Sequence, residues 1–370
     1  MQVGEQNRGE LQVNVTDSDN APIRDARVTI SEPETAINPN SPIERLETDV
    51  SGQTQIVDLN TPPLEYSLNE NNENMPYANY NIQIEVPGYE TENIRNVEIL
   101  PDSLSLQNVR MRKREGEQVE NIDIDPHTLY AEYPEKIPED EIKDVNEPGE
   151  IVLSRVVIPE YVVVHNGTPS SNARDYYVTY KDYIKNVASS EIYATWPRAT
   201  IEANVLAIMS FTLNRVYTEW YRNKGYDFTI TSSTAYDQKW IYGRNIFQSI
   251  DEVVDEIFDQ YLSRPDVRQP ILTQYCDGKR VTCPNWLSQW GSCNLGEQGF
   301  GTLEIIRNYY GDDMYINTAE QISGIPASWP GYDLTIGASG QKVMQMQEQL
   351  DTHCQSLHSH SKSFSRWSFR

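Results

Sequence analysis

The sequence predicts a multidomain chain in which an N-terminal all-β sandwich is followed by an acidic linker and an α+β domain. Residues 1–113 hold short apolar-alternating segments between turns rich in Asn, Pro and Gly, which is typical of antiparallel sandwiches. Residues 114–150 carry 13 acidic and 3 basic side chains. Helical periodicity begins after residue 151, and a length of 370 residues fits two or three domains.

The expected sandwich begins with two alternating runs. Leu11, Val13 and Val15 alternate in the first run, Val28 and Ile30 in the second, and the DSDNAP turn separates the runs. Further strands are expected within 48–59, 80–89 and 97–111. The stretches APIRDARVTI, TDVSGQT and YNIQIEVPGYE resemble the carboxypeptidase-regulatory-like and transthyretin-like sandwiches. Such domains are usually accessory, so the resemblance implies a spacer or adhesion module.

Residues 114–150 also contain four prolines, and their net charge is −10. This composition predicts a charged, extended linker.

Residues 151–330 form the expected α+β domain. One or two strands are expected within 151–167, and helices over 182–192, 197–225, 246–262 and 303–310. The second of these helices has the strongest pattern, because apolar residues recur at three- and four-residue steps from Ile201 to Trp220. Pro197 suits its first turn and Gly225 its C-terminal stop.

Beyond residue 330, two short segments are expected. In DLTIGASGQKVMQMQEQL (333–350), a glycine turn leads into a helix, and the segment resembles the opening of the helical peptidoglycan-binding repeat. We therefore assign 331–350 to the start of such a repeat. Residues 351–370 hold three of the five histidines but no apolar periodicity, so we predict a non-native or disordered tail without a metal site.

The bulk composition excludes some classes of function. A net charge of −25 argues against a nucleic-acid partner, because phosphate binding needs cations. No apolar run approaches the ~18 residues that a membrane span needs. The N-terminal stretch MQVGEQNRGELQVNV lacks the apolar core of a signal peptide.

The four cysteines do not have the spacing of a zinc site. Cys276, Cys283 and Cys293 lie within 18 residues and have no nearby histidine. In oxidising surroundings Cys276 and Cys283 would form a disulfide across CDGKRVTC, and in reducing surroundings both would be free thiols. The sequence leaves both states open.

Three motifs follow one another in the expected α+β domain. They are YIKNVASSEIYATWPRATIEANVLAI (183–208), TSSTAYDQKWIYGR (231–244) and LSQWGSCNLGEQGFGTLEIIRNYYGDD (287–313). In this order they resemble the stage II sporulation protein D family of cell-wall proteins. The family contains lytic transglycosylases that cut glycan strands lacking stem peptides, and an amidase-enhancing branch that binds without cutting. The resemblance covers about 140 residues.

The resemblance places the family's catalytic glutamate at Glu191. Lytic cleavage needs one proton donor at the glycosidic oxygen, because the sugar's own 6-hydroxyl then attacks the anomeric carbon; ordinary glycosidases use two carboxyls. Such a glutamate must stay protonated in an apolar setting, which Ile192 and nearby aromatic rings would supply. No cofactor and no metal is expected. The expected substrate-binding residues are Tyr193, Trp196, Tyr236, Gln238, Trp240, Ser288, Gln289 and Trp290.

Two departures from the family pattern bear on activity. Met209-Ser210 stand where family enzymes commonly carry Arg-Thr, and Ala235-Tyr236 stand where some members carry a zinc-ligating His-Cys pair. The first hypothesis is therefore a peptidoglycan lytic transglycosylase. The second is a non-catalytic wall-binding or amidase-modulating protein, for which a cell-wall amidase is a further partner. The third is a structural component of a spore or phage-like particle. The first two hypotheses imply a cell-wall or spore location.

Overall fold

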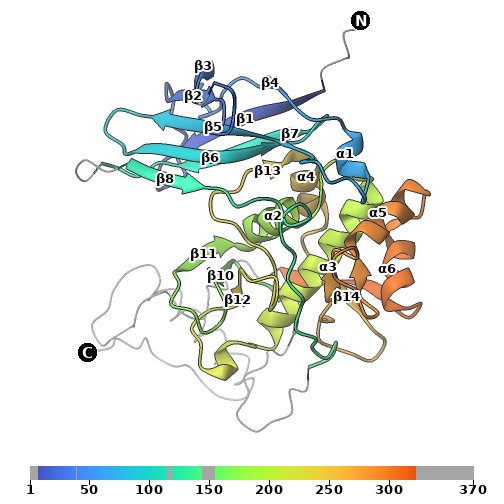
Figure 1. The fold of residues 1–370 in the computed structure, drawn as a ribbon. Helices are drawn as coiled ribbons and strands as arrows, with labels where there is room; N and C mark the ends of the chain where they lie inside the picture. Colours follow the sequence, from blue (N-terminus) through green and yellow to red (C-terminus); the bar gives the residue numbers. More distant parts are fainter. Residues whose placement is uncertain (1–6, 39, 115–118, 144–154, 322–370) are drawn as a thin grey trace, which may run out of the picture.

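The computed structural model describes residues 7–38, 40–114, 119–143 and 155–321. These residues form a mixed α/β structure with several sheets and six α-helices. In Figure 1 two layers of strands lie above a group of helices, and the chain passes between the two regions more than once.

The upper region is a β-sandwich. Its sheets have the strand orders β3-β2-β5-β6-β8 and β13-β7-β1-β4. Apolar residues from both sheets share one core, including Val13, Ile30, Ile82 and Val109. The strands are β1 (Arg8–Thr16), β2 (Arg27–Ser31), β3 (Pro42–Glu47), β4 (Val57–Asn60), β5 (Ala78–Glu85), β6 (Thr91–Ile99), β7 (Leu104–Arg110), β8 (Val119–Asp123) and β13 (Ile246–Phe247).

The predicted alternation of β1 is confirmed, since Leu11, Val13 and Val15 are buried and their neighbours are more exposed. The strand expected within 48–59 forms only at its end, as β4. Before it, Asp49 accepts hydrogen bonds from the backbone N–H groups of Ser51 and Gln53, which fixes a turn.

The lower region is organised around α3 (Arg198–Tyr217), a helix that is buried on nearly every side. It contacts the four other helices of this region. The helices that cover it are α2 (Tyr180–Glu191), α4 (Gln248–Ile257), α5 (Gln289–Glu297) and α6 (Thr302–Tyr310). The helix expected over 197–225 ends earlier, at Tyr217. Gly225, with a φ of 85°, instead ends the separate 3-10 helix Arg222–Lys224.

Small sheets complete the lower region, in the orders β11-β10-β12, β14-β17, β15-β16 and β18-β9. The helix expected over 246–262 is wrong at both ends: Ile246 and Phe247 form β13, α4 ends at Ile257, and β14 follows. The strands are β9 (Val157–Ile158), β10 (Tyr161–His165), β11 (Asp175–Thr179), β12 (Ile230–Thr231), β14 (Gln260–Ser263), β15 (Tyr275–Cys276), β16 (Leu287–Ser288), β17 (Tyr315–Thr318) and β18 (Glu320–Gln321).

The sandwich is joined to the helical region by buried polar contacts. Strand β13 adds residues 246–247 to the sandwich edge beside β7. Just before it, Arg244 donates to the Glu98 carboxylate at 2.6 Å, and both side chains are almost fully buried. The Asn245 amide donates to the Glu98 carbonyl at 2.8 Å. The sandwich is therefore packed onto the helical region and is not a detached spacer.

The segment predicted as a solvated linker differs from that prediction over its described part. Val119–Asp123 form β8, which pairs in parallel with β6. Residues 125–143, which we name the covering segment, then run without helix or strand along the helical region (Figure 1). His127, Leu129, Tyr133 and Lys136 of this segment are buried. Its net negative charge hid these inward-facing residues.

Several expectations lie outside the described residues. These are the start of a peptidoglycan-binding repeat at 331–350, the tail at 351–370, and the linker's ends at 115–118 and 144–150.

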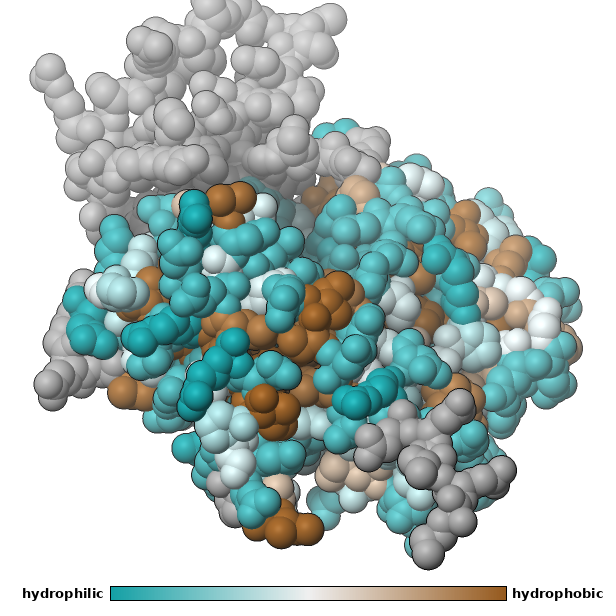
Figure 2. Space-filling model, turned by 90° about the horizontal axis from the view of Figure 1, so that it is seen from above, coloured by the Kyte–Doolittle hydropathy of each residue, from teal (hydrophilic) through white to brown (hydrophobic). Residues whose placement is uncertain are grey.

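Hydrophilic residues cover most of the face seen from above the sandwich (Figure 2), where hydrophobic residues gather in a central group and a few smaller ones. Within the described part of the chain, no helix has the length and apolar character that would let it cross a membrane.

The Glu98–Arg244 pair generates a stability prediction. Glu98→Ala leaves the Arg244 guanidinium buried without its counter-charge, so we expect a loss of about 3–5 kcal/mol in unfolding free energy. Urea denaturation measures this loss. The control is Asp123→Ala, which removes the exposed partner of Arg95 and should cost less than about 1 kcal/mol. Equal effects of the two substitutions would contradict a stabilising role for the buried pair at the junction.

Candidate active site

Glu191 is the last residue of α2, and the local sequence explains where this helix begins and ends. Thr179 caps the N-terminus, because its hydroxyl accepts a hydrogen bond from the Asp182 N–H. Ile192 is extended, with φ of −135° and ψ of 151°, so the helix stops at Glu191. The Glu191 side chain is 0% exposed. The solvated helix-end carboxylate, which is the ordinary state of a lone surface glutamate, does not occur here.

Both oxygens of the Glu191 carboxyl have defined partners. Oε1 accepts the backbone N–H of Lys239 at 2.7 Å, and Oε2 accepts the Tyr275 hydroxyl at 2.5 Å. The two partners come from different elements: Lys239 from the loop between β12 and β13, and Tyr275 from strand β15. The carboxyl is thereby held in one orientation.

The environment of Glu191 favours its protonated form. Burial raises the pKa of its carboxyl above the ordinary value, while the charge of Lys136, the Tyr275 hydroxyl and the Lys239 N–H oppose this rise. Burial also lowers the pKa of Lys136, although the charges of Glu191 and Asp237 favour its ammonium form. The Lys136 ammonium donates to the Asp237 carbonyl at 2.8 Å and lies 4.5 Å from the centre of the Tyr275 ring.

Three of the expected substrate-binding aromatic residues meet beside Glu191. Tyr193 packs edge-on against Trp196 at 5.8 Å and against Trp290 at 6.0 Å between ring centres, and the two indoles are 5.1 Å apart. All three are at most 4% exposed. The Trp196 Nε1–H donates to the Ser67 carbonyl of α1 (Glu65–Leu68) at 2.9 Å, so this ring also anchors the sandwich.

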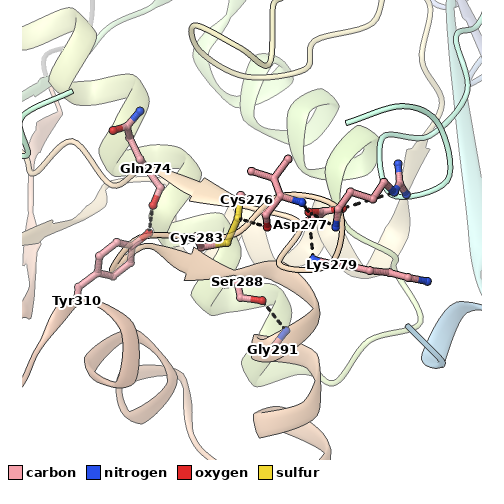
Figure 3. The surroundings of a disulfide bond; sticks show 10 residues. Gln274, Cys276, Asp277, Lys279, Cys283, Ser288, Gly291 and Tyr310 are labelled. Atoms are coloured by element: carbon pink, nitrogen blue, oxygen red, sulfur yellow. Dashed lines mark hydrogen bonds and ion pairs between the residues drawn. A yellow bond between two sulfur atoms is a disulfide. The ribbon is translucent and has the colours of Figure 1, made fainter. Parts of the chain in front are cut away.

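The SQWG stretch starts α5. The Ser288 hydroxyl accepts from the Gly291 N–H at 3.0 Å and caps the helix (Figure 3). Gln289 is fully buried, and neither atom of its side-chain amide has a hydrogen-bond partner within the described residues. The motif therefore has a structural role at Ser288 and leaves an unsatisfied amide at Gln289.

The middle motif is divided between core and surface. Gln238 is fully buried, where its amide oxygen accepts the hydroxyls of Tyr183 and Thr212. Trp240 packs against Tyr176 at 5.1 Å. Tyr236 is half-buried, and its carbonyl accepts from Arg215. The structure does not bring Gln238 to a surface that a substrate reaches.

Sequence reasoning missed four residues that surround the carboxyl: Tyr275, Lys239, Lys136 and Tyr133. Tyr133 is 7% exposed and lies close enough to Glu191 for that charge to raise its pKa further. Lys239 contributes its backbone, which carries no residue-specific signal. Lys136 had a weak signal, since it is one of two lysines in an otherwise acidic covering segment.

Cys276 and Cys283 form a disulfide, with Cα atoms 5.7 Å apart (Figure 3). In the turn that the disulfide closes, the Asp277 carboxylate accepts the backbone N–H groups of Lys279, Arg280 and Val281. Gly278 has a φ of 77°, and a Cβ there would lie 1.8 Å from the Ser288 hydroxyl oxygen. The turn brings the Arg280 guanidinium to the Leu129 carbonyl of the covering segment.

Two pockets border the residues around Glu191. One, of about 180 Å³, is lined by residues that include Tyr66, Tyr130, Tyr193, Lys279, Arg280 and Trp290. The other, of about 280 Å³, is lined by residues that include Asp125, Pro126, Thr128, Thr234 and Lys239. A larger hollow of about 820 Å³ lies on the sandwich, away from this chemistry. Neither of the two smaller pockets is lined by Glu191 itself.

Within the described residues, no group of three or more His, Cys, Asp or Glu side chains is placed to hold a metal ion.

Comparison with known proteins does not assign a family. No family model matches the sequence, and no curated protein matches it. Solved structures match with TM-scores near 0.2. The TIE protein of Bacillus anthracis is 12% identical over 29% of this chain and 17% of its own, with a TM-score of 0.19. Catechol 1,2 dioxygenase of Acinetobacter radioresistens is 13% identical over 32% of this chain and 58% of its own, with a TM-score of 0.22. The minor pilin of Streptococcus agalactiae is 17% identical over 31% of this chain and 48% of its own, with a TM-score of 0.21. This chain spans less than two thirds of each.

The cysteines generate a labelling prediction. Burial raises the pKa of the Cys293 thiol to about 12, so at pH 8 only about one thiol in 10⁴ is ionised. After mild reduction, iodoacetamide should label the half-buried Cys283 and leave Cys293 unlabelled, as read by peptide mass spectrometry. Unfolding in guanidinium, as the control, should make both labels complete. Rapid native labelling of Cys293 would contradict its burial.

Proposed function

We propose that this protein cleaves peptidoglycan glycan strands by lytic transglycosylation, with Glu191 as both acid and base. The observation that carries the proposal is the fully buried Glu191 carboxyl, oriented by the Lys239 N–H and the Tyr275 hydroxyl. Burial favours the protonated carboxyl that a general acid needs near neutral pH.

The reaction requires one carboxyl. Glu191 donates its proton to the glycosidic oxygen as the C–O bond breaks. The resulting carboxylate then takes the proton of the sugar's 6-hydroxyl, whose oxygen attacks the anomeric carbon. The product is a 1,6-anhydro ring, no water is consumed, and Glu191 ends protonated. A hydrolytic mechanism would instead use a second carboxyl.

The other buried carboxylates of this region are committed to structural partners. Asp237 accepts from Arg215, Tyr221 and Thr231 at 2.6 to 2.7 Å. Asp277 accepts three backbone N–H groups of its own turn. Neither is free to act as a nucleophile or to activate water, which favours the one-carboxyl reaction.

The domain organisation belongs to the same proposal. Two contacts fix the sandwich to the catalytic region: the one between α1 and Trp196, and the Glu98–Arg244 pair. Residues 151–330 carry the chemistry, and residues 331–350 begin a peptidoglycan-binding repeat. The partner is peptidoglycan, in the cell wall or around a spore.

A second candidate is a protein that binds the wall or modulates an amidase without cleaving glycan. The observation that favours it is Met209, which stands where the resembling family has an arginine and is 0% exposed within the core. Its neighbour Ser210 bonds the Leu206 carbonyl and the Leu262 N–H, so both positions have structural roles.

Digestion of peptide-free glycan strands separates the two candidates. The parent protein should release 1,6-anhydro-muramyl products, and Glu191→Gln should lower the rate about 10²- to 10⁴-fold, because the amide cannot donate the proton. Mass spectrometry identifies the products.

The other outcomes are equally specific. Reducing-end products would indicate a hydrolase that uses a second carboxyl. Binding without products from the parent protein would support the second candidate. If the parent protein neither binds the strands nor releases products, both candidates are overturned.

The pH dependence follows from the protonated state of Glu191. The folded pKa is raised, so the active acid form persists above the ordinary carboxyl value of 4.5 and is lost as the pH rises through the raised value. We therefore expect kcat/KM for soluble strands to fall on the alkaline side, with a midpoint above 4.5. A midpoint at or below 4.5 would contradict the proposed role. The residual activity of Glu191→Gln should lack this limb.

A further inference from the structure

Residues 125–133 of the covering segment lie across the end of α2 that carries Glu191. The Thr128 N–H donates to the Ser190 carbonyl at 3.0 Å, and the His127 Nε2 is 3.3 Å from the Ile192 carbonyl. The segment thus contacts the residue on each side of Glu191. Four of its side chains are at most 7% exposed: His127, Thr128, Leu129 and Tyr133.

The same residues form a wall shared by the two small pockets. Leu129 and Tyr130 line the pocket of about 180 Å³, which also contacts Tyr193 and Trp290. Pro126, Thr128 and Ala131 line the pocket of about 280 Å³. That second pocket also contacts Lys239, whose N–H holds Glu191. Residues 125–133 therefore lie between two hollows. One borders Tyr193, two positions after Glu191 in the chain, and the other borders Lys239, whose N–H is bonded to Glu191.

The segment places a ring of its own on an aromatic side chain of the site. The His127 imidazole stacks on Tyr193, with ring centres 4.5 Å apart and planes 30° apart. The face of an aromatic ring is also where the flat, C–H-rich face of a sugar would pack. His127 therefore occupies a position that a sugar ring would take.

In the closed arrangement, two buried polar groups lack hydrogen-bond partners among the described residues. The Tyr133 hydroxyl is buried and has no hydrogen-bond partner within the described residues, and the same holds for the Gln289 amide. Buried polar groups without partners lower the stability of the arrangement that buries them. Tyr133 lies near Glu191, and Gln289 precedes Trp290, which packs against Tyr193. A hydroxyl-rich ligand would satisfy groups of this kind.

The two halves of the covering segment are held differently. From Ile137 to Lys143 the backbone is bonded by the side chains of Gln274 and Gln269, and Glu139 pairs with the buried Arg215. Residues 125–133 are held by the Thr128 N–H, the His127 contacts, the Arg280 side chain and the ion pair between Asp125 and Lys239. The second half is thus bonded to the helical region at more points than the first.

We propose that residues 125–133 are a built-in cover that fills the middle of one sugar-binding groove, whose two ends are the two pockets. A glycan strand of N-acetylated sugars binds when this cover lifts. The inference rests on the proposed function, since it takes glycan as the ligand. Binding then competes with closure, so the apparent affinity is reduced by the fraction of molecules that are open.

The test uses peptide-free glycan strands and the full chain in a Glu191→Gln background, so that binding is measured without cleavage. Leu129→Ala weakens the cover, and Leu59→Ala removes an equally buried leucine from β4 as the matched control. We expect Leu129→Ala to bind strands about tenfold more tightly or better, because more molecules are open, and Leu59→Ala to leave the affinity unchanged. Circular dichroism checks that both variants fold.

Amide hydrogen exchange gives the second readout. Binding of glycan strands to the Glu191→Gln protein should reduce protection of the Thr128 amide, which donates to the Ser190 carbonyl of α2 in the closed form. Binding with unchanged or increased protection there, or equal affinities of the two leucine variants, would overturn the cover while leaving the proposed function intact. If no variant binds strands, both the cover and the proposed function fail.

Discussion

A buried carboxyl at the end of α2 sets the main constraint on this structure. Glu191 is removed from water, so each of its oxygens needs a partner inside the protein. The Lys239 N–H and the Tyr275 hydroxyl supply them, which requires a loop and strand β15 to meet at one helix end. Lys136 of the covering segment adds a positive charge nearby. The disulfide turn and the SQWG helix start lie on the same side, where Cys276 and Ser288 pair in β15 and β16.

The charges of the covering segment fit the same constraint. Lys136 faces a region that holds Glu191 and Asp237, and Glu139 faces Arg215. The buried Arg215 is thereby paired with a carboxylate of the covering segment, and Lys136 brings a positive charge to the region of Glu191 and Asp237. Residues 137–143 of the segment contribute to the stability of the fold. Residues 125–133 cover the candidate site and, in our proposal, control access of the glycan to it.

Local sequence patterns predicted those helices and strands whose buried residues recur with a regular spacing in the sequence. The β1 alternation, the core of α2 and α3, and α6 follow from apolar spacing, and Glu191 was found through a family resemblance. The covering segment was missed because its few inward residues are spaced irregularly among charges. The end of the helix expected over 246–262 was wrong because tertiary pairing with β17 draws residues 260–263 into β14. Tyr275 and the Lys239 backbone reach Glu191 only through the fold, so no local pattern marks them.

The proposed mechanism requires Glu191 to keep its proton at pH values above the ordinary carboxyl pKa of 4.5. Infrared difference spectroscopy of the parent protein minus Glu191→Gln measures this directly, since a protonated carboxyl and a carboxylate absorb at different frequencies. We expect a protonated-carboxyl band that persists at pH values above the ordinary carboxyl pKa of 4.5. Complete conversion to the carboxylate at or below that value would contradict it.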